Sequence, residues 1–212
     1  MKSIKYILLL FLLPVGAFAQ ETSGGHGGGM VFENFFAFAW DVNIPMGSNK
    51  YVESTSFAGG KMEYRHIIGN NISVGVDVSW NSYYDYKPYQ TFHLNNNTDV
   101  TTDVYKYNYT LPLALTFHKY FYNGGMITPF AGIGLGALYD RPSLFFNIYE
   151  LYEENWGFLV RPELGALVKL DRSGDMALFV GARYSYSTNQ ETSFKIDGLS
   201  ALGFQLGLCW AY

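Results

Sequence analysis

The chain has 212 residues, a formal net charge of −4, 18% aromatic residues and only 15% charged residues. This length predicts a single domain, and the acidic balance without a basic stripe argues against a nucleic-acid partner. The only cysteine, Cys209, excludes an internal disulfide, and no later apolar run reaches the roughly 18 residues of a spanning helix.

Residues 1–19 have the pattern of a cleaved secretory signal peptide. Lys2 and Lys5 precede the apolar run 7–13, and the small-residue motif Ala17-Phe18-Ala19 ends the segment. Residues 20–30 are rich in glycine and predict a flexible leader. The remaining residues, 31–212, are expected to form the folded domain.

From residue 32 onward, large side chains alternate with small or polar ones at a period of two, which predicts β-strands. Eight such segments follow in chain order: 32–42, 57–66, 72–81, 105–117, 130–139, 160–169, 178–185 and 201–212. In the last segment the even positions are Leu202, Phe204, Leu206, Leu208, Trp210 and Tyr212, and the odd positions are small or polar. A strand of about ten residues suffices to cross the hydrocarbon when it is tilted.

Short turns alternate with longer polar segments between these strands. Residues 67–71, 122–125 and 171–175 contain the glycine, asparagine or aspartate of tight turns. The segments 43–56, 85–103, 140–155 and 189–198 are expected to be loops. Both ends of the domain should then lie on the side of the short turns, which is periplasmic in bacterial outer-membrane barrels.

The unlike faces of the strands predict an all-β fold: an eight-stranded antiparallel up-and-down transmembrane β-barrel with its bulky residues toward lipid. Strands in lipid need hydrogen bonds on both edges, so the sheet has to close. Pro112 and Pro162 lie within strands and lack the backbone donor, which predicts a bulge or a missing hydrogen bond at each.

Charges of both signs lie on the inward face, which predicts a lumen filled by ion pairs without room for free water flow. The side chains assigned to this lumen network are Asp41, Lys61, Glu63, Arg65, Asp77, Lys106, Arg161, Glu163, Lys169 and Arg183.

Aromatic side chains near the strand ends predict two interfacial girdles. The upper girdle is assigned Trp40, Trp80, Tyr83, Tyr84, Tyr107, Tyr139, Trp156, Tyr184 and Tyr186. The lower girdle is assigned Tyr64, Phe117, Tyr120, Trp210 and Tyr212. A stacking platform for carbohydrate would need these rings on one surface, so membrane anchoring is the preferred interpretation.

No catalytic, cofactor or metal site is predicted. The candidate bases His66, His93 and His118 show no Ser-His-acid spacing. Residues 183–189 are similar to the strand of lipid A deacylases that carries a catalytic histidine and serine, but Tyr186 occupies the histidine position. Asp171 and Asp175 could hold Ca²⁺, although a solvated turn explains them without a ligand set.

Four segments carry a family resemblance: GKMEYR at 60–65, ISVGVDVSW at 72–80, TPFAGIGLGALY at 128–139 and LGFQLGLCWAY at 202–212. With them the chain resembles the small bacterial outer-membrane β-barrel family, in particular its OmpX, OmpA-barrel and OmpW groups. The resemblance implies an outer-membrane location and contact with lipid and lipopolysaccharide. It also implies that the insertion machinery recognises Leu208, Trp210 and Tyr212.

Members of this family serve in adhesion, defence, small-molecule passage or envelope structure, and the fold does not choose among these roles. A structural or surface-interaction role, through the loops and a surface partner, is the first hypothesis. The acidic segment 140–155 could contact lipopolysaccharide through divalent cations or bind a basic partner. A narrow channel for small solutes and a lipid A-modifying enzyme are the alternatives, although a non-enzymatic protein is expected.

Overall fold

The computed structural model describes residues 34–47, 51–69, 71–94, 98–121, 125–146, 149–170 and 175–211. The predicted signal peptide 1–19, the leader 20–30 and Tyr212 lie outside these residues. Within them there is no helix long and apolar enough to cross a membrane.

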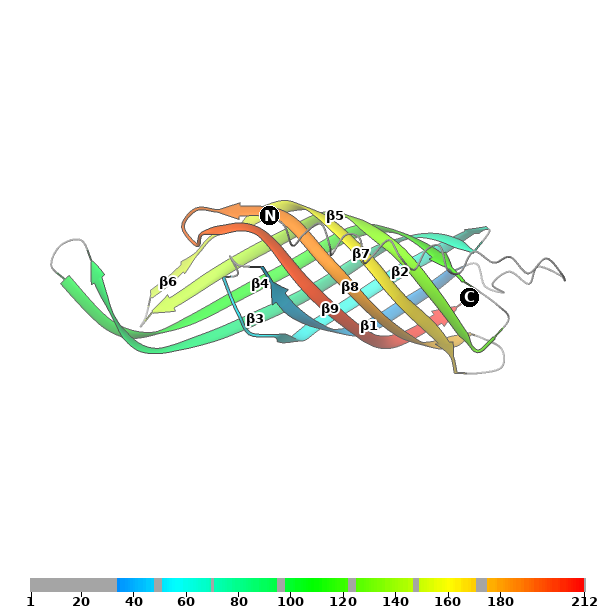
Figure 1. Ribbon diagram of the computed structural model, residues 1–212, viewed down its shortest axis with the longest axis horizontal. Helices are drawn as coiled ribbons and strands as arrows, with labels where there is room; N and C mark the ends of the chain where they lie inside the picture. The colour runs from blue at the N-terminus through cyan, green and yellow to red at the C-terminus, as the bar shows by residue number, and fades with distance from the viewer. Residues whose placement is uncertain are drawn as a thin grey trace, which may run out of the picture.

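The described segments are β-strands joined by short connections (Figure 1). The strands are β1 Asn34–Met46, β2 Ser56–Gly69, β3 Ile72–Leu94, β4 Thr98–Tyr120, β5 Ile127–Phe146, β6 Tyr149–Tyr152, β7 Asn155–Lys169, β8 Met176–Glu191 and β9 Ile196–Ala211. Strands β6 and β7 both pair with β5, at successive positions, so together they make one staggered strand of the barrel. The described residues therefore form eight barrel strands.

The barrel closes where the first strand pairs with the last. Strand β1 is antiparallel to β9 from Phe35 opposite Ala211 to Met46 opposite Ser200. All other neighbours are antiparallel and consecutive along the chain. The predicted eight-stranded up-and-down barrel is thus confirmed, and the described chain ends meet at the end of the short turns (Figure 1).

The predicted faces are also confirmed. On β9, Gly203, Gln205 and Cys209 are buried toward the lumen. Phe204 and Leu206 are 47% and 50% exposed on the outside. Successive side chains of a strand point to opposite faces, so every second side chain of β9 lies on the outer face.

The two prolines interrupt the sheet without a bulge. The β3–β4 ladder lacks pairs opposite Leu111 and Pro112 and resumes in the same register, with Val78 opposite Leu113 and Asn81 opposite Thr110. The β7–β8 ladder is interrupted in the same way at Pro162. The missing hydrogen bond is the correct alternative, and the face assignments on both strands hold.

Two expected loops prove to be strands. Residues 85–94 and 98–103 extend β3 and β4 into a hairpin that projects beyond the rest of the barrel (Figure 1). Residues 140–146 and 149–152 form the hairpin of β5 and β6. The alternation rule misses these segments because their surroundings are not apolar. Cross-strand contacts hold the hairpin instead, as in the 2.9 Å hydrogen bond between the Thr91 and Thr101 hydroxyls.

Residues 51–55, which precede β2, fold into the outer mouth of the barrel. Tyr51 and Val52 are buried against Tyr83 and Ile196. The Tyr51 hydroxyl donates a 2.9 Å hydrogen bond to the Ser143 carbonyl on β5. We call residues 51–55 the mouth segment, because they cover the lumen at this end.

Candidate functional site

Lys61 lies at the centre of the charged lumen. Its Nζ is 2.9 Å from Glu63 Oε2, 3.1 Å from Asp77 Oδ2 and 2.9 Å from Glu163 Oε2. These carboxylates come from β2, β3 and β7, so the ammonium group joins strands from different sides of the barrel. Alternation along β2 puts residues 61, 63 and 65 on the same inward face.

Arg65 fills the lumen on the side of the short turns. Its guanidinium donates to Glu63, to Glu163 Oε1 at 3.1 Å and to the Tyr120 hydroxyl at 2.8 Å. The Phe130 ring centroid lies 4.9 Å from the guanidinium carbon. An arginine can stack on rings while its edge hydrogen-bonds, so both surfaces of the group are satisfied.

Arg161 and Arg183 continue the network toward the outer mouth. Arg161 pairs with Asp77 and donates to Ser79 Oγ at 3.1 Å. Arg183 pairs with Asp41. With the Gln205 amide turned so that both of its ends find partners, its oxygen accepts from Arg183 Nε at 3.1 Å and Nη1 at 3.0 Å.

The charged side chains that meet in the lumen are buried and carry equal numbers of positive and negative charges. Eight of the ten side chains assigned from the sequence form the observed lumen network, and each is at most 3% exposed: the cations Lys61, Arg65, Arg161 and Arg183 and the anions Asp41, Glu63, Asp77 and Glu163. Buried charges are tolerated when they are paired and hydrogen-bonded. The network therefore fills the cross-section that an aqueous pore would need.

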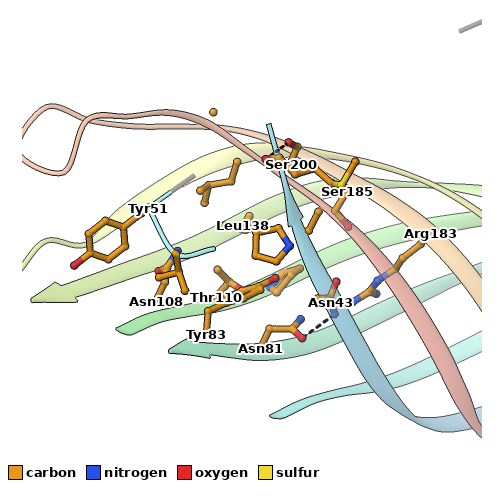
Figure 2. A pocket seen from close by; sticks show the side chains of 17 residues that line it. Asn43, Tyr51, Asn81, Tyr83, Asn108, Thr110, Leu138, Arg183, Ser185 and Ser200 are labelled. Carbon is orange, nitrogen blue, oxygen red and sulfur yellow. Dashed lines mark hydrogen bonds between the residues drawn. The ribbon is translucent and has the colours of Figure 1, made fainter. Parts of the chain in front are cut away.

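A small cavity lies between the lumen network and the mouth segment (Figure 2). Its volume is about 60 Å³, enough for a few water molecules. Arg183 lies at its inner end, where Asn43 Nδ2 donates a 2.8 Å hydrogen bond to Asn81 Oδ1. Tyr51 and Val52 line it toward the mouth. The cavity is lined by amide, hydroxyl and apolar groups in addition to this one guanidinium.

A comparison with solved structures finds proteins of similar architecture. Neisserial surface protein A aligns over 84% of this chain and 97% of its own, with 13% identity and a TM-score of 0.53. The chain has the fold of the small outer-membrane β-barrels. No protein-family model and no curated protein matches it.

Two further small outer-membrane barrels align at lower TM-scores. The attachment invasion locus protein Ail of Yersinia pestis, in complex with the heparin analogue sucrose octasulfate, has 13% identity and a TM-score of 0.43. It covers 85% of this chain and 97% of its own. The N-terminal β-barrel domain of Pseudomonas aeruginosa OprF has 11% identity and a TM-score of 0.43, with 84% and 99% covered.

In this barrel, eight of the ten residues assigned to the lumen from the sequence lie together. Lys106 is half-buried at the outer mouth, with its Nζ 4.9 Å from the Tyr51 ring centroid. Lys169 is half-buried opposite Ala177, near the short-turn end of the barrel. Of the residues assigned to the insertion signal, Trp210 is 41% exposed on the outer face and Leu208 is half-buried.

Three of the described lumen side chains had been assigned other roles from the sequence. Tyr83 and Tyr120 were assigned to the girdles, but they are 8% and 1% exposed and point inward. His118 is buried with its Nε2 3.6 Å from Glu163 Oε1. The two-residue alternation could have identified them. Tyr120 and His118 fall on the same inward face of β4 as Thr116, and Tyr83 falls on the same inward face of β3 as Ser79 and Asn81.

The candidate histidine bases do not come together. His66 is exposed on the outer face with its Nδ1 2.8 Å from Asn34 Oδ1, whereas His118 lies in the lumen. His93 is on the projecting part of β3, opposite Asp99. In the part of the chain that is described, no three His, Cys, Asp or Glu residues form a group that could hold a metal ion. Asp171 lies outside that part.

Two carboxyl groups without hydrogen-bond partners lie at the outer mouth. Asp140 on β5 is fully buried and Glu191 on β8 is 5% exposed, and their oxygens have no partner among the described residues. Asp140 follows Tyr139, which the sequence assigned to the outer girdle, and Glu191 lies at the outer end of β8. Burial and then the nearby Glu191 raise the pKa of Asp140 to about 7. Burial and then Glu153 raise the pKa of Glu191 to about 7.

We expect the outer mouth to be more stable at pH 5 than at pH 8. The folded protein holds these two protons more tightly than the unfolded chain, so stability rises as the pH falls from about 7 toward the ordinary carboxyl values near 4. Hydrogen exchange of residues 51–56, corrected for the intrinsic rate, should show greater protection at pH 5. The double variant Asp140→Asn and Glu191→Gln should lose this difference. Equal protection of the wild type at both pH values would contradict the assignment.

Proposed function

We propose that this protein is a sealed outer-membrane barrel with a structural or surface-interaction role, carried out by its extracellular strands and connections. The observation that supports this proposal is the neutral lumen network. Eight charged side chains from β1, β2, β3, β7 and β8 pair with one another across the lumen. Opening a path for solute would require breaking several buried ion pairs at once, which is costly.

The outer end of the molecule supports the second half of the proposal. The mouth segment covers the lumen, while the β3–β4 hairpin projects well beyond it (Figure 1). A projecting hairpin of this length is not needed to close or fill a barrel. It offers a surface to the head groups of the surrounding leaflet or to molecules beyond the membrane.

The proposal includes the path to the membrane. Residues 1–19 would direct export and be removed, leaving the leader 20–30 before the barrel. Leu208, Trp210 and Tyr212 would be recognised by the barrel-insertion machinery. The inserted protein would then contact lipid through the bulky outer face and lipopolysaccharide through the outer strand ends.

Planar-bilayer recording tests the sealed lumen. The purified protein, refolded and inserted, is expected to give no stable single-channel steps, because the ion pairs occupy the lumen cross-section. A trimeric porin inserted under the same conditions serves as the control for insertion and detection. Reproducible unitary steps from the wild-type protein would overturn the sealed reading and favour the narrow channel.

A further inference from the structure

Five aromatic rings gather on one outward surface of neighbouring hairpins. We call them the aromatic ladder: Tyr84 and Tyr86 on β3, Tyr105 and Tyr107 on β4, and Phe145 on β5. The ring centroids of Tyr84 and Tyr107 are 5.0 Å apart, and so are those of Tyr86 and Tyr105. Tyr107 and Phe145 meet edge to face at 5.6 Å. This is the gathered arrangement that the sequence interpretation of separate anchors did not anticipate.

The aromatic ladder begins at the membrane interface and continues away from it. On β4 the lipid-facing residues Leu115, Leu113 and Leu111 are followed by Tyr109, Tyr107 and Tyr105. Tyr105 is six residues beyond Leu111, or about 20 Å along the strand. Girdle rings need only reach the interface, so the upper rings of the aromatic ladder lie beyond the level at which anchoring explains them.

The rings remain accessible in spite of their mutual contacts. Tyr84, Tyr86 and Tyr107 are 44%, 47% and 40% exposed. Tyr105, Tyr107 and Phe145 line a shallow depression of the outer surface. A hydrogen bond with the Asp103 side chain raises the pKa of Tyr105 above its ordinary value, which places a carboxylate at the upper end of the aromatic ladder.

We propose that the aromatic ladder binds neutral sugar residues of the lipopolysaccharide that surrounds the barrel. The negative face of an aromatic ring attracts the C–H face of a pyranose ring. The tyrosine hydroxyls can donate hydrogen bonds to sugar hydroxyls and accept them, and the Asp103 carboxylate can accept them. None of the five ladder residues is cationic, so the recognised group is the sugar rather than a phosphate.

The position of the aromatic ladder selects this ligand. It lies on the same face of the strands as the lipid-contacting residues Leu111 and Leu113, directly beyond them. The molecules that touch this face above the hydrocarbon are the head groups of the same leaflet. The inference rests on the proposed outer-membrane placement and surface role, but not on the sealed lumen. The conductance experiment therefore neither supports nor overturns it.

Saturation-transfer NMR tests the proposal with the lipid-free core oligosaccharide of lipopolysaccharide as the probe. The protein is placed in phospholipid nanodiscs that contain no lipopolysaccharide. The test variant carries Tyr86→Ser and Tyr105→Ser. The matched control carries Phe57→Ser and Tyr186→Ser, which removes two exposed outer rings, 64% and 47% exposed, from β2 and β8. The heat-dependent gel shift of a folded barrel confirms that each variant folds.

We expect the oligosaccharide to bind the wild type and the control, and the test variant to bind at least about tenfold more weakly. The variant Tyr105→Phe, which keeps the ring and loses the hydroxyl bonded to Asp103, should fall between the two. Absence of binding to the wild type, or equal binding to the test variant, would overturn the proposal. Membrane anchoring would then be the role of these rings. Equal loss in the control variant would overturn it as well, since the binding would then not belong to the aromatic ladder.

Discussion

Replacing Glu163 with glutamine is expected to destabilise the barrel by about 3–5 kcal/mol, because it leaves buried cations without their counter-charge. Glu163 lies 2.9 Å from Lys61 Nζ and 3.1 Å from the Arg65 guanidinium. The variant lumen would hold four cations against three anions. Unfolding by urea in lipid vesicles, followed by tryptophan fluorescence, measures the loss.

Two comparisons separate this effect from a general loss of charge. The variant Glu150→Gln removes a carboxylate that is 3.5 Å from Arg141 in a partly exposed pair, and should cost less than about 1 kcal/mol. Adding Lys61→Met to Glu163→Gln should recover part of the loss, because the two side chains are coupled. If the two glutamine variants unfolded alike, the lumen network would not hold the barrel together.

Replacing Leu206 with arginine is expected to cost about 2–4 kcal/mol, the range measured for a charge at the midplane of a barrel's lipid face. Leu206 lies near the middle of β9, is 50% exposed and is paired with Trp40 and Val180. Trp40 is likewise at the middle of β1, so its assignment to the upper girdle was wrong. In a soluble protein, a charge at so exposed a position would change stability little. The same urea titration in vesicles measures the difference.

The control for this prediction is Tyr89→Arg, at a residue that is 74% exposed on the projecting hairpin. It should change the free energy of unfolding by less than about 0.5 kcal/mol. Similar effects of the two arginine variants would contradict the assignment of the Leu206 face to lipid.

The face of nearly every barrel residue was predictable from local alternation. Leu206 and Gln205 are neighbours in the chain, yet one lies outside at 50% exposure and the other is buried at 2%. The direction of the Cβ atom reverses at each residue of a strand, so a short stretch of sequence is enough to assign both faces. The same rule places Tyr83 and Tyr120 inside the barrel, whereas their aromatic character had suggested a position at the membrane interface.

Which lumen residues meet, and where the strands end, followed only from the folded chain. Lys61 and Glu163 are 102 residues apart and come into contact across the lumen of the closed barrel. Their contact depends on strand number, tilt and stagger, which are properties of all the strands together. The outer segments add a second case: beyond the hydrocarbon the surroundings no longer impose alternation, so only pairing with neighbours decides that residues 85–94 continue β3 and that the mouth segment folds inward.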